Sequence, residues 1–284
     1  MLEKNIETFI ACDKAYDEAD FVLWGAPFDS TTSFRPGTRF ASSAIRHESF
    51  GIETYSPYLD KDLEEDVNVF DAGDLELVFG DSPRVLAQVE EMTTTIMNDG
   101  KIPFMIGGEH SLSSAPVKAL LAKYPDLHII HFDAHTDLRE DYLGMKWSHA
   151  SVIKRCWDMI GDGKINSFGI RSGEKDEFYW AKEHINLHKF NFEGLEETVE
   201  ALKGKPVYFT LDLDVMDPSI FPGTGTPEAG GVSFEELRQA ILKLKDLNIV
   251  GLDMMELSPH YDQSGASTAV AVKLVREILL TLAK

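Results

Sequence analysis

The chain has little cysteine, few basic residues and no long apolar run. Its 284 residues include only Cys12 and Cys156, which are far apart and in no ligand spacing, so neither a disulfide framework nor a zinc–thiolate site is indicated. No apolar stretch approaches the roughly 20 residues that a membrane-spanning helix needs. Lysine and arginine number 27 against 48 aspartate and glutamate, a formal charge of −21, so no basic excess is available to neutralise nucleic-acid phosphates.

What is present points to an acidic globular protein. Hydrophobic residues make up 43% of the chain, enough for a sizeable core. The acidic surplus favours solubility and would raise the local concentration of cationic small molecules. The segment from Met1 to Asp20 has no apolar stretch of the kind that signal peptides contain. We therefore expect a soluble, cytoplasmic protein with neither a nucleic-acid nor a membrane partner.

Short apolar runs alternate with helical patterns along the whole chain. The run from Leu127 to Phe132 is nearly continuous in apolar residues, which is typical of a strand covered on both faces in a parallel sheet. The alternation predicts a single three-layer α/β/α domain over residues 1–284, with a mainly parallel sheet of about eight strands. The expected strands are 21–25, 67–71, 102–106, 127–133, 165–170, 185–187, 207–212 and 249–256.

Two of the expected helices carry clear start signals. Ser82 is a candidate N-cap for a helix over 83–98, with Pro83 at its first position. Ser233 and Glu236 form a capping box for a helix over 234–247. The other expected helices are 111–123, 148–160, 178–184, 192–202 and 268–282.

Potential metal ligands gather in three patches, and each patch ends an apolar run. The patches are Gly-Gly-Glu-His at 107–110, Asp-Ala-His-Thr-Asp at 133–137 and Asp-Leu-Asp at 212–214. Alternate residues of an extended segment share a face, so the acidic and histidine side chains of a patch can converge. Taken singly, each of these aspartates is more commonly a helix cap than a metal ligand. Together, at the carboxyl ends of parallel strands where ligands bind, they predict a metal site.

Four carboxylates and two imidazoles are enough to hold two divalent ions with a bridging water, a device that makes hydroxide at neutral pH. The carboxylate-rich set favours harder ions such as manganese and leaves zinc, cobalt and nickel open. A hydrolase of the deacetylase type with one zinc ion has a similar architecture. The presence of both His110 and Asp137, which completes a second metal position, argues against it.

These patches resemble the motifs of the ureohydrolase (arginase/agmatinase) family, and most of all its bacterial agmatinases. Residues 210–223 read Thr-Leu-Asp-Leu-Asp-Val-Met-Asp-Pro-Ser-Ile-Phe-Pro-Gly, and Gly231 follows at the family's distance. Thr210 is a small departure, because the family often has serine there. The resemblance runs from Trp24 to Pro259 and covers nearly the whole chain.

The resemblance implies two Mn²⁺ ions per chain. His110 and Asp137 would belong to the first ion, and His135 and Asp214 to the second. Asp133 and Asp212 would bridge the two. The implied metal ligands are therefore His110, Asp133, His135, Asp137, Asp212 and Asp214.

The resemblance also implies a reaction and three catalytic residues. Glu256 would hold a substrate guanidinium through two parallel hydrogen bonds. A hydroxide between the metals would attack the guanidinium carbon and release urea and an amine. Asp137 would give a proton to the leaving amine, and His149 would exchange protons with bulk water. The family commonly forms trimers or hexamers.

The loop over 138–147 bears on the substrate. In the family that the chain resembles, an arginase recognises the carboxylate and ammonium of its substrate with polar residues of this loop, including Asn and Ser. Here the loop has no Asn or Ser before Ser148, so the resemblance argues against arginase and favours agmatine, cleaved to putrescine and urea. Glu140 or Asp141 could meet a terminal ammonium, whereas Arg139 could serve a carboxylate-tailed substrate such as guanidinobutyrate. Formimidoylglutamase and a non-catalytic family member stay open as alternatives.

For several residues near the patches, a structural or supporting role is an alternative to a role in catalysis. Glu109 is expected to give structural support, and Asp253 could support the ligands. His128 and His131 are interpreted as satisfied residues of the sheet. His260 follows Glu256 closely and could line the cavity.

Overall fold

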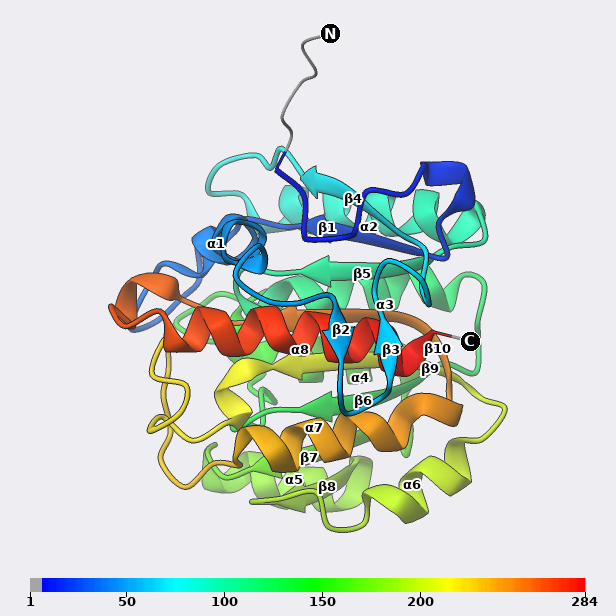
Figure 1. The fold of residues 1–284 in the computed structure, drawn as a ribbon. Helices are drawn as coiled ribbons and strands as arrows, with labels where there is room; N and C mark the ends of the chain where they lie inside the picture. The colour runs from blue at the N-terminus through cyan, green and yellow to red at the C-terminus, as the bar shows by residue number, and fades with distance from the viewer. Residues whose placement is uncertain (1–6, 284) are drawn as a thin grey trace, which may run out of the picture.

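An eight-stranded sheet runs through the centre of the computed structural model, which describes residues 7–283 (Figure 1). Its strand order is β4-β1-β5-β10-β9-β6-β7-β8, and every neighbouring pair is parallel. The prediction of a mainly parallel sheet of about eight strands is confirmed. The strands are β1 (Phe21–Gly25), β4 (Val69–Asp74), β5 (Ile102–Ile106), β6 (His128–Phe132), β7 (Ile165–Ile170), β8 (Asn186–Lys189), β9 (Pro206–Asp212) and β10 (Asn248–Met255).

Helices cover both faces of this sheet, which confirms the three-layer arrangement. Helices α1, α6, α7 and α8 share one hydrophobic cluster with the sheet, and α2 to α5 pack on the other side (Figure 1). Neighbouring residues of a strand serve opposite layers: in β9, Phe209 lies in the first cluster and Tyr208 in the second. The α-helices are α1 (Ala41–Ser49), α2 (Ser82–Asn98), α3 (Ser114–Leu121), α4 (Val152–Ile160), α5 (Lys175–His184), α6 (Leu195–Leu202), α7 (Phe234–Leu242) and α8 (Ala266–Leu282).

The helix N-termini confirm one predicted cap and contradict another. The capping box of Ser233 and Glu236 is present at α7. At α2 the predicted cap is wrong by one residue: Asp81 accepts the backbone N–H of Arg84, and Ser82 is the first helical residue. Three expected helices begin or end with 3₁₀ turns, namely η3 (His110–Ser113), η4 (His149–Ser151) and η6 (Lys243–Asp246).

The segment between β1 and β4 was not foreseen. It contains η2 (Thr38–Phe40), α1 and a small hairpin of β2 (Tyr55–Ser56) and β3 (Lys61–Asp62). Helix α1 has a weak apolar pattern because one of its buried residues is Arg46, whose guanidinium pairs with Asp71 and Asp74. A buried ion pair replaces the apolar stripe by which helices are recognised.

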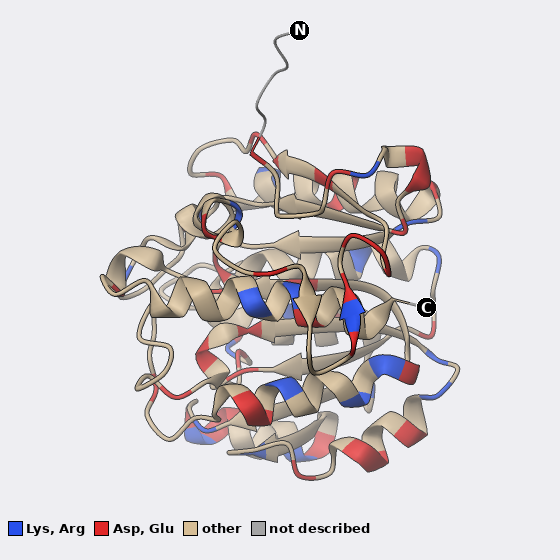
Figure 2. Ribbon diagram, viewed as in Figure 1, with Lys and Arg blue, Asp and Glu red and all other residues tan. Residues whose placement is uncertain are grey.

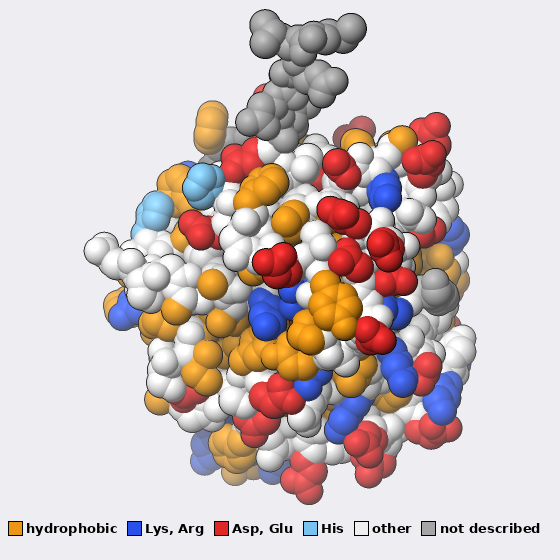
Figure 3. All heavy atoms as spheres, viewed as in Figure 1, with side chains coloured by type: hydrophobic (Ala, Val, Ile, Leu, Met, Phe, Trp, Pro, Cys, Tyr) orange, Lys and Arg blue, Asp and Glu red, His pale blue; other side chains and the backbone are white. Residues whose placement is uncertain are grey.

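Acidic residues are spread over the outer helices and loops, including the hairpin, with basic ones between them (Figure 2). On the face drawn in Figure 3, acidic and basic side chains are interspersed. Within residues 7–283, no helix is both long and apolar enough to cross a membrane.

Candidate metal centre

Four adjacent strands bring the predicted site together. Strands β5, β10, β9 and β6 are neighbours in the sheet and run in the same direction. His110 follows β5, Glu256 follows β10, Asp212 ends β9 and Asp133 follows β6. Residues far apart in sequence therefore meet at one edge, as the carboxyl-end rule for parallel sheets predicts.

The structure places all six predicted ligands in one cluster, in which every member except the partly exposed His135 is buried. The Nδ1 atom of His110 lies 3.0 Å from Asp133 Oδ2, 3.2 Å from Asp137 Oδ2 and 3.3 Å from Asp212 Oδ2. The Nδ1 atom of His135 lies 2.9 Å from Asp214 Oδ2 and 3.5 Å from Asp133 Oδ1. Asp133 therefore faces both imidazoles with different oxygens, an arrangement suited to a carboxylate shared between two ions.

The electrostatics of this cluster demand positive charge. Burial raises the pKa of Asp212 well above its ordinary value, and the neighbouring Asp214 and Asp133 raise it further. Burial alone would lower the pKa of His110, but its contacts with Asp133, Asp137 and Asp212 outweigh burial and raise it. Crowded carboxylates repel one another in the absence of a cation, and bound divalent ions usually neutralise this repulsion.

A chain of hydrogen bonds fixes which nitrogen of His110 faces the carboxylates. Tyr208 and Thr210 both donate their hydroxyl protons to the buried carboxylate of Asp253, Thr210 at 2.6 Å. The Thr210 oxygen must then accept from the Nε2–H of His110, 2.9 Å away. When the imidazole is neutral, as a metal ligand must be, Nδ1 carries the lone pair, and this atom is buried and without a hydrogen bond in the described structure. A lone pair aimed at carboxylates fits a metal ion between them.

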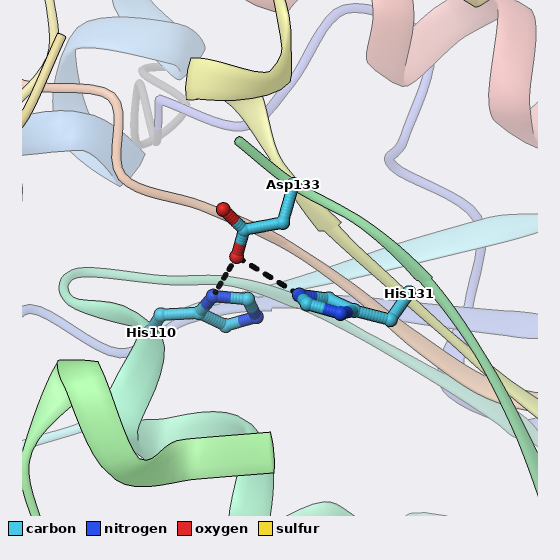
Figure 4. A group of neighbouring side chains, drawn as sticks. All are labelled: His110, His131 and Asp133. Carbon is cyan, nitrogen blue, oxygen red and sulfur yellow. Dashed lines mark hydrogen bonds and ion pairs between the residues drawn. The ribbon is translucent and has the colours of Figure 1, made fainter. Parts of the chain in front are cut away.

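A second chain supports Asp133. The Nε2 atom of His131 lies 2.9 Å from Asp133 Oδ2 (Figure 4). The Nδ1 atom of His131 lies 2.9 Å from the Ser167 hydroxyl. His131 is fully buried and satisfied, as expected, but its partner is a predicted metal ligand. Neither this contact nor Ser167 was foreseen. His128 differs: it is partly exposed and lies 3.7 Å from Asp126.

The two glycines before His110 serve close packing. Neither adopts a positive φ. A Cβ atom at Gly108 would overlap the Phe28 carbonyl group, and one at Gly107 would overlap the Met255 side chain. Gly108 therefore lets the segment after β1 approach the end of β5, and Gly107 leaves room for the side chain of Met255 at the end of β10.

Asp137 and Glu256 have unusual backbones. Their φ angles are 52° and 67°, in the left-handed region that non-glycine residues seldom occupy. The Glu256 carboxylate is buried and accepts the backbone N–H of His110 at 2.7 Å. Burial raises the pKa of Asp137 to about 6, and the nearby Asp133 contributes to the rise.

A cavity of about 240 Å³ opens above the cluster. Near its mouth, Glu174 Oε1 and Arg139 Nη1 are 2.7 Å apart. Its lining includes Ser33, His110, His135, Asp137, Arg139, Tyr142, His149, Glu174, Asp212 and Glu256. Glu174 was not foreseen, although it follows β7 at the same edge of the sheet.

The two acidic residues expected to meet a substrate ammonium point elsewhere. Glu140 pairs with Lys154 at 3.2 Å, and Asp141 accepts the Gly144 N–H at 3.0 Å. Both line a neighbouring cavity.

His260 lies against the Phe40 ring, with centroids 4.7 Å apart. Burial lowers the pKa of His149 to about 4, so its imidazole is neutral at pH 7.

A cluster of this kind, at the carboxyl edge of a parallel α/β sheet, marks a binuclear metallohydrolase. The arginase family model matches residues 19–281, and the chain belongs to this family. It is 49% identical to an agmatinase of Bacillus anthracis over 278 residues, or 96% of each chain. It is 48% identical to an agmatinase of Bacillus subtilis, covering 98% of this chain and 97% of the relative. The crystal structure of a putative agmatinase from Clostridium difficile superposes with a TM-score of 0.92 at 51% identity, covering 95% of this chain and 99% of that one.

Proposed function

We propose that this chain hydrolyses agmatine to putrescine and urea. The observation that carries the proposal is a buried carboxylate, Glu256, at the floor of a cavity that is also lined by four of the six predicted ligands, namely His110, His135, Asp137 and Asp212. A buried carboxylate with a raised pKa is stabilised by a cation, and guanidinium offers two parallel donors to it. The relatives named agmatinase, at about half identity over nearly the full chain, support the same substrate.

His110, Asp133, His135, Asp137, Asp212 and Asp214 would hold the metal ions. When bound, a pair of divalent ions would supply a water-derived nucleophile at neutral pH. Glu256 would orient the guanidinium carbon toward that nucleophile. Asp137 would carry a proton to the leaving amine. His149 lies above them in the cavity wall and would exchange protons with solvent.

The far end of the cavity is compatible with an ammonium tail. Glu174 would attract the terminal amine of agmatine, and Arg139, its present partner, would be displaced or shared. Arg139 is also the residue that favours the alternative, a carboxylate-tailed substrate such as guanidinobutyrate. The acidic chain as a whole favours a cationic substrate.

Manganese is our expectation for the native metal, because the ligands are mostly carboxylates. Assembly into trimers or hexamers, a cytoplasmic location and a part in polyamine synthesis through putrescine complete the proposal.

The test compares four substrates. Manganese-loaded protein is assayed for urea from agmatine, arginine and guanidinobutyrate, and for formamide from formiminoglutamate. We expect agmatine to give the highest kcat/KM by at least about 10-fold, a difference of about 1.4 kcal/mol in transition-state stabilisation. Absence of urea from agmatine, with two metal ions bound per chain, would contradict the proposal.

A further inference from the structure

The loop between β1 and η2 holds His149 at two points. The backbone N–H of His149 donates to Thr31 Oγ1 at 3.1 Å. Its ring nitrogen Nε2 lies 3.1 Å from Ser33 Oγ. Thr31 and Ser33 thus reach across more than a hundred residues of sequence to place one imidazole in the cavity wall. No sequence pattern pointed to either of them.

This loop is in turn fixed by the buried carboxylate of Glu109. Glu109 accepts the Thr31 N–H at 2.6 Å, the Thr31 hydroxyl at 2.5 Å and the Ser111 hydroxyl at 2.5 Å. Its side chain is fully buried. Because Thr31 gives its only hydroxyl proton to Glu109, the Thr31 oxygen is free to accept the His149 N–H. Glu109 therefore connects the loop that carries His110 with the loop that carries Ser33.

The two ring nitrogens of His149 have different surroundings. Nδ1 is buried and has no hydrogen-bond partner within residues 7–283. Nε2 contacts the hydroxyl of Ser33, which is an exposed residue. His149 and Ser33 both line the cavity above the ligand cluster. A proton that enters or leaves this imidazole thus has a ready path at Nε2, and the first group on that path is a hydroxyl open to solvent.

We propose that the Ser33 hydroxyl carries protons between His149 Nε2 and solvent, and that Glu109 and Thr31 position it for this task. In the outward step the Nε2–H bond of protonated His149 breaks and a new O–H bond forms on Ser33. The original hydroxyl proton of Ser33 passes to a water molecule at the same time. Two protons shift, the net result is the transfer of one proton from His149 to water, and nothing is oxidised or reduced. This inference rests on the proposed hydrolysis, in which His149 serves proton exchange.

A hydroxyl is a good carrier here because it can accept and donate at once. Burial lowers the pKa of His149 to about 4, so a proton on this ring is short-lived and a nearby acceptor speeds its release. Ser33 is a positioning residue as well, because its contact at Nε2 fixes the orientation of the ring.

The experiment compares Ser33→Ala with Ser33→Thr. The threonine variant keeps the hydroxyl at an exposed position and is the matched control. Urea release from agmatine is measured at low and high concentrations of a small imidazole buffer, with metal content measured in parallel. We expect Ser33→Ala to lower kcat about 10-fold at low buffer, to leave KM within about two-fold, and to recover at high buffer because the buffer replaces the hydroxyl. Ser33→Thr should behave like the parent.

Each other outcome overturns the inference in a different way. An unchanged kcat in Ser33→Ala at low buffer shows that no proton needs this hydroxyl. A kcat loss that buffer does not restore assigns Ser33 to ring placement alone, and a rise in KM alone assigns it to substrate contact. If the parent protein itself releases no urea from agmatine, the proposed function fails and the Ser33 comparison is not the cause.

The positioning role of Thr31 is tested by a second pair of variants. Thr31→Val removes the hydroxyl that joins Glu109 to His149, and Thr31→Ser retains it. We expect the valine variant to bind two metal ions per chain yet to show the same buffer-dependent loss of kcat, and the serine variant to restore kcat. Loss of kcat in both variants would assign Thr31 to packing and would contradict the positioning role.

Discussion

The floor and the mouth of the cavity are built by opposite means. At the floor, His110 and Asp133 are buried, and each is held by a second buried side chain, Thr210 and His131 respectively. At the mouth, Arg139 and Glu174 form an ion pair that solvent reaches, with side chains 30% and 62% exposed, and the Arg139 guanidinium also lies over the Tyr142 ring. The ligands at the floor are therefore fixed by several buried contacts, whereas the side chains at the mouth are free to change partners.

This difference separates the reaction from the substrate. A ligand set must keep its geometry to within a fraction of an ångström, so buried networks suit it. Recognition of a substrate tail tolerates looser contacts, because exposed ion pairs contribute only about 0–1 kcal/mol each. Mutations at the floor should therefore affect metal and kcat, and mutations at the mouth should affect KM. Four substitutions, given from the largest expected effect to the smallest, test this difference between the floor and the mouth.

Asp212→Asn removes a charge from the centre of the floor. We expect urea release to fall by more than about 1,000-fold and bound metal to fall below two ions per chain, because a buried shared carboxylate is lost. Elemental analysis and a urea assay measure both. Asp141→Asn is the control, since Asp141 only accepts the Gly144 N–H in an exposed loop. Full metal content with normal activity in Asp212→Asn would remove Asp212 from the site.

Glu256→Gln keeps the shape of the floor and removes its charge. The expected fall in kcat/KM for agmatine is about 100-fold, because losing one partner of a buried charge pair costs about 3 kcal/mol. Metal content should stay at two ions per chain. A variant that loses metal instead would place Glu256 among the ligands and would contradict its assignment to the guanidinium.

Thr210→Val breaks the chain from Asp253 to His110, whereas Thr210→Ser preserves it. We expect the valine variant to bind metal about 10- to 100-fold more weakly, as is usual when the hydrogen-bond partner of a metal-bound histidine is lost. Titration with Mn²⁺ followed by calorimetry gives the affinities. Unchanged Mn²⁺ affinity in Thr210→Val would show that the hydroxyl does not matter.

Glu174→Gln tests the mouth. We expect KM for agmatine to rise by no more than about five-fold with kcat unchanged, because the group is more than half exposed. The KM for guanidinobutyrate should fall, since Arg139 is released from its partner. Steady-state kinetics with both substrates would show it, and a large loss of kcat would mean that the mouth takes part in the reaction.

How far the sequence predicted the molecule follows the same division. The strands and the ligand patches were readable because apolar runs and Asp or His at their ends are local patterns. Helix α1 was missed because Arg46 is paired in the core, and the Asp81 cap was misplaced because Ser82 offers the same chemistry one residue later. Ser33, Thr31 and Glu174 carry no local signal. Their positions depend on loops that meet only after the sheet has formed.

The backbone at Asp137 and Glu256 has a consequence for engineering. Both residues occupy left-handed conformations that cost roughly 1–2 kcal/mol for residues with a Cβ and nothing for glycine. A screen for thermal stability alone would therefore favour glycine or asparagine at these positions and would discard the two carboxylates. Selection for heat resistance in this protein should be coupled to an activity assay, because its most stable sequence is not a working enzyme.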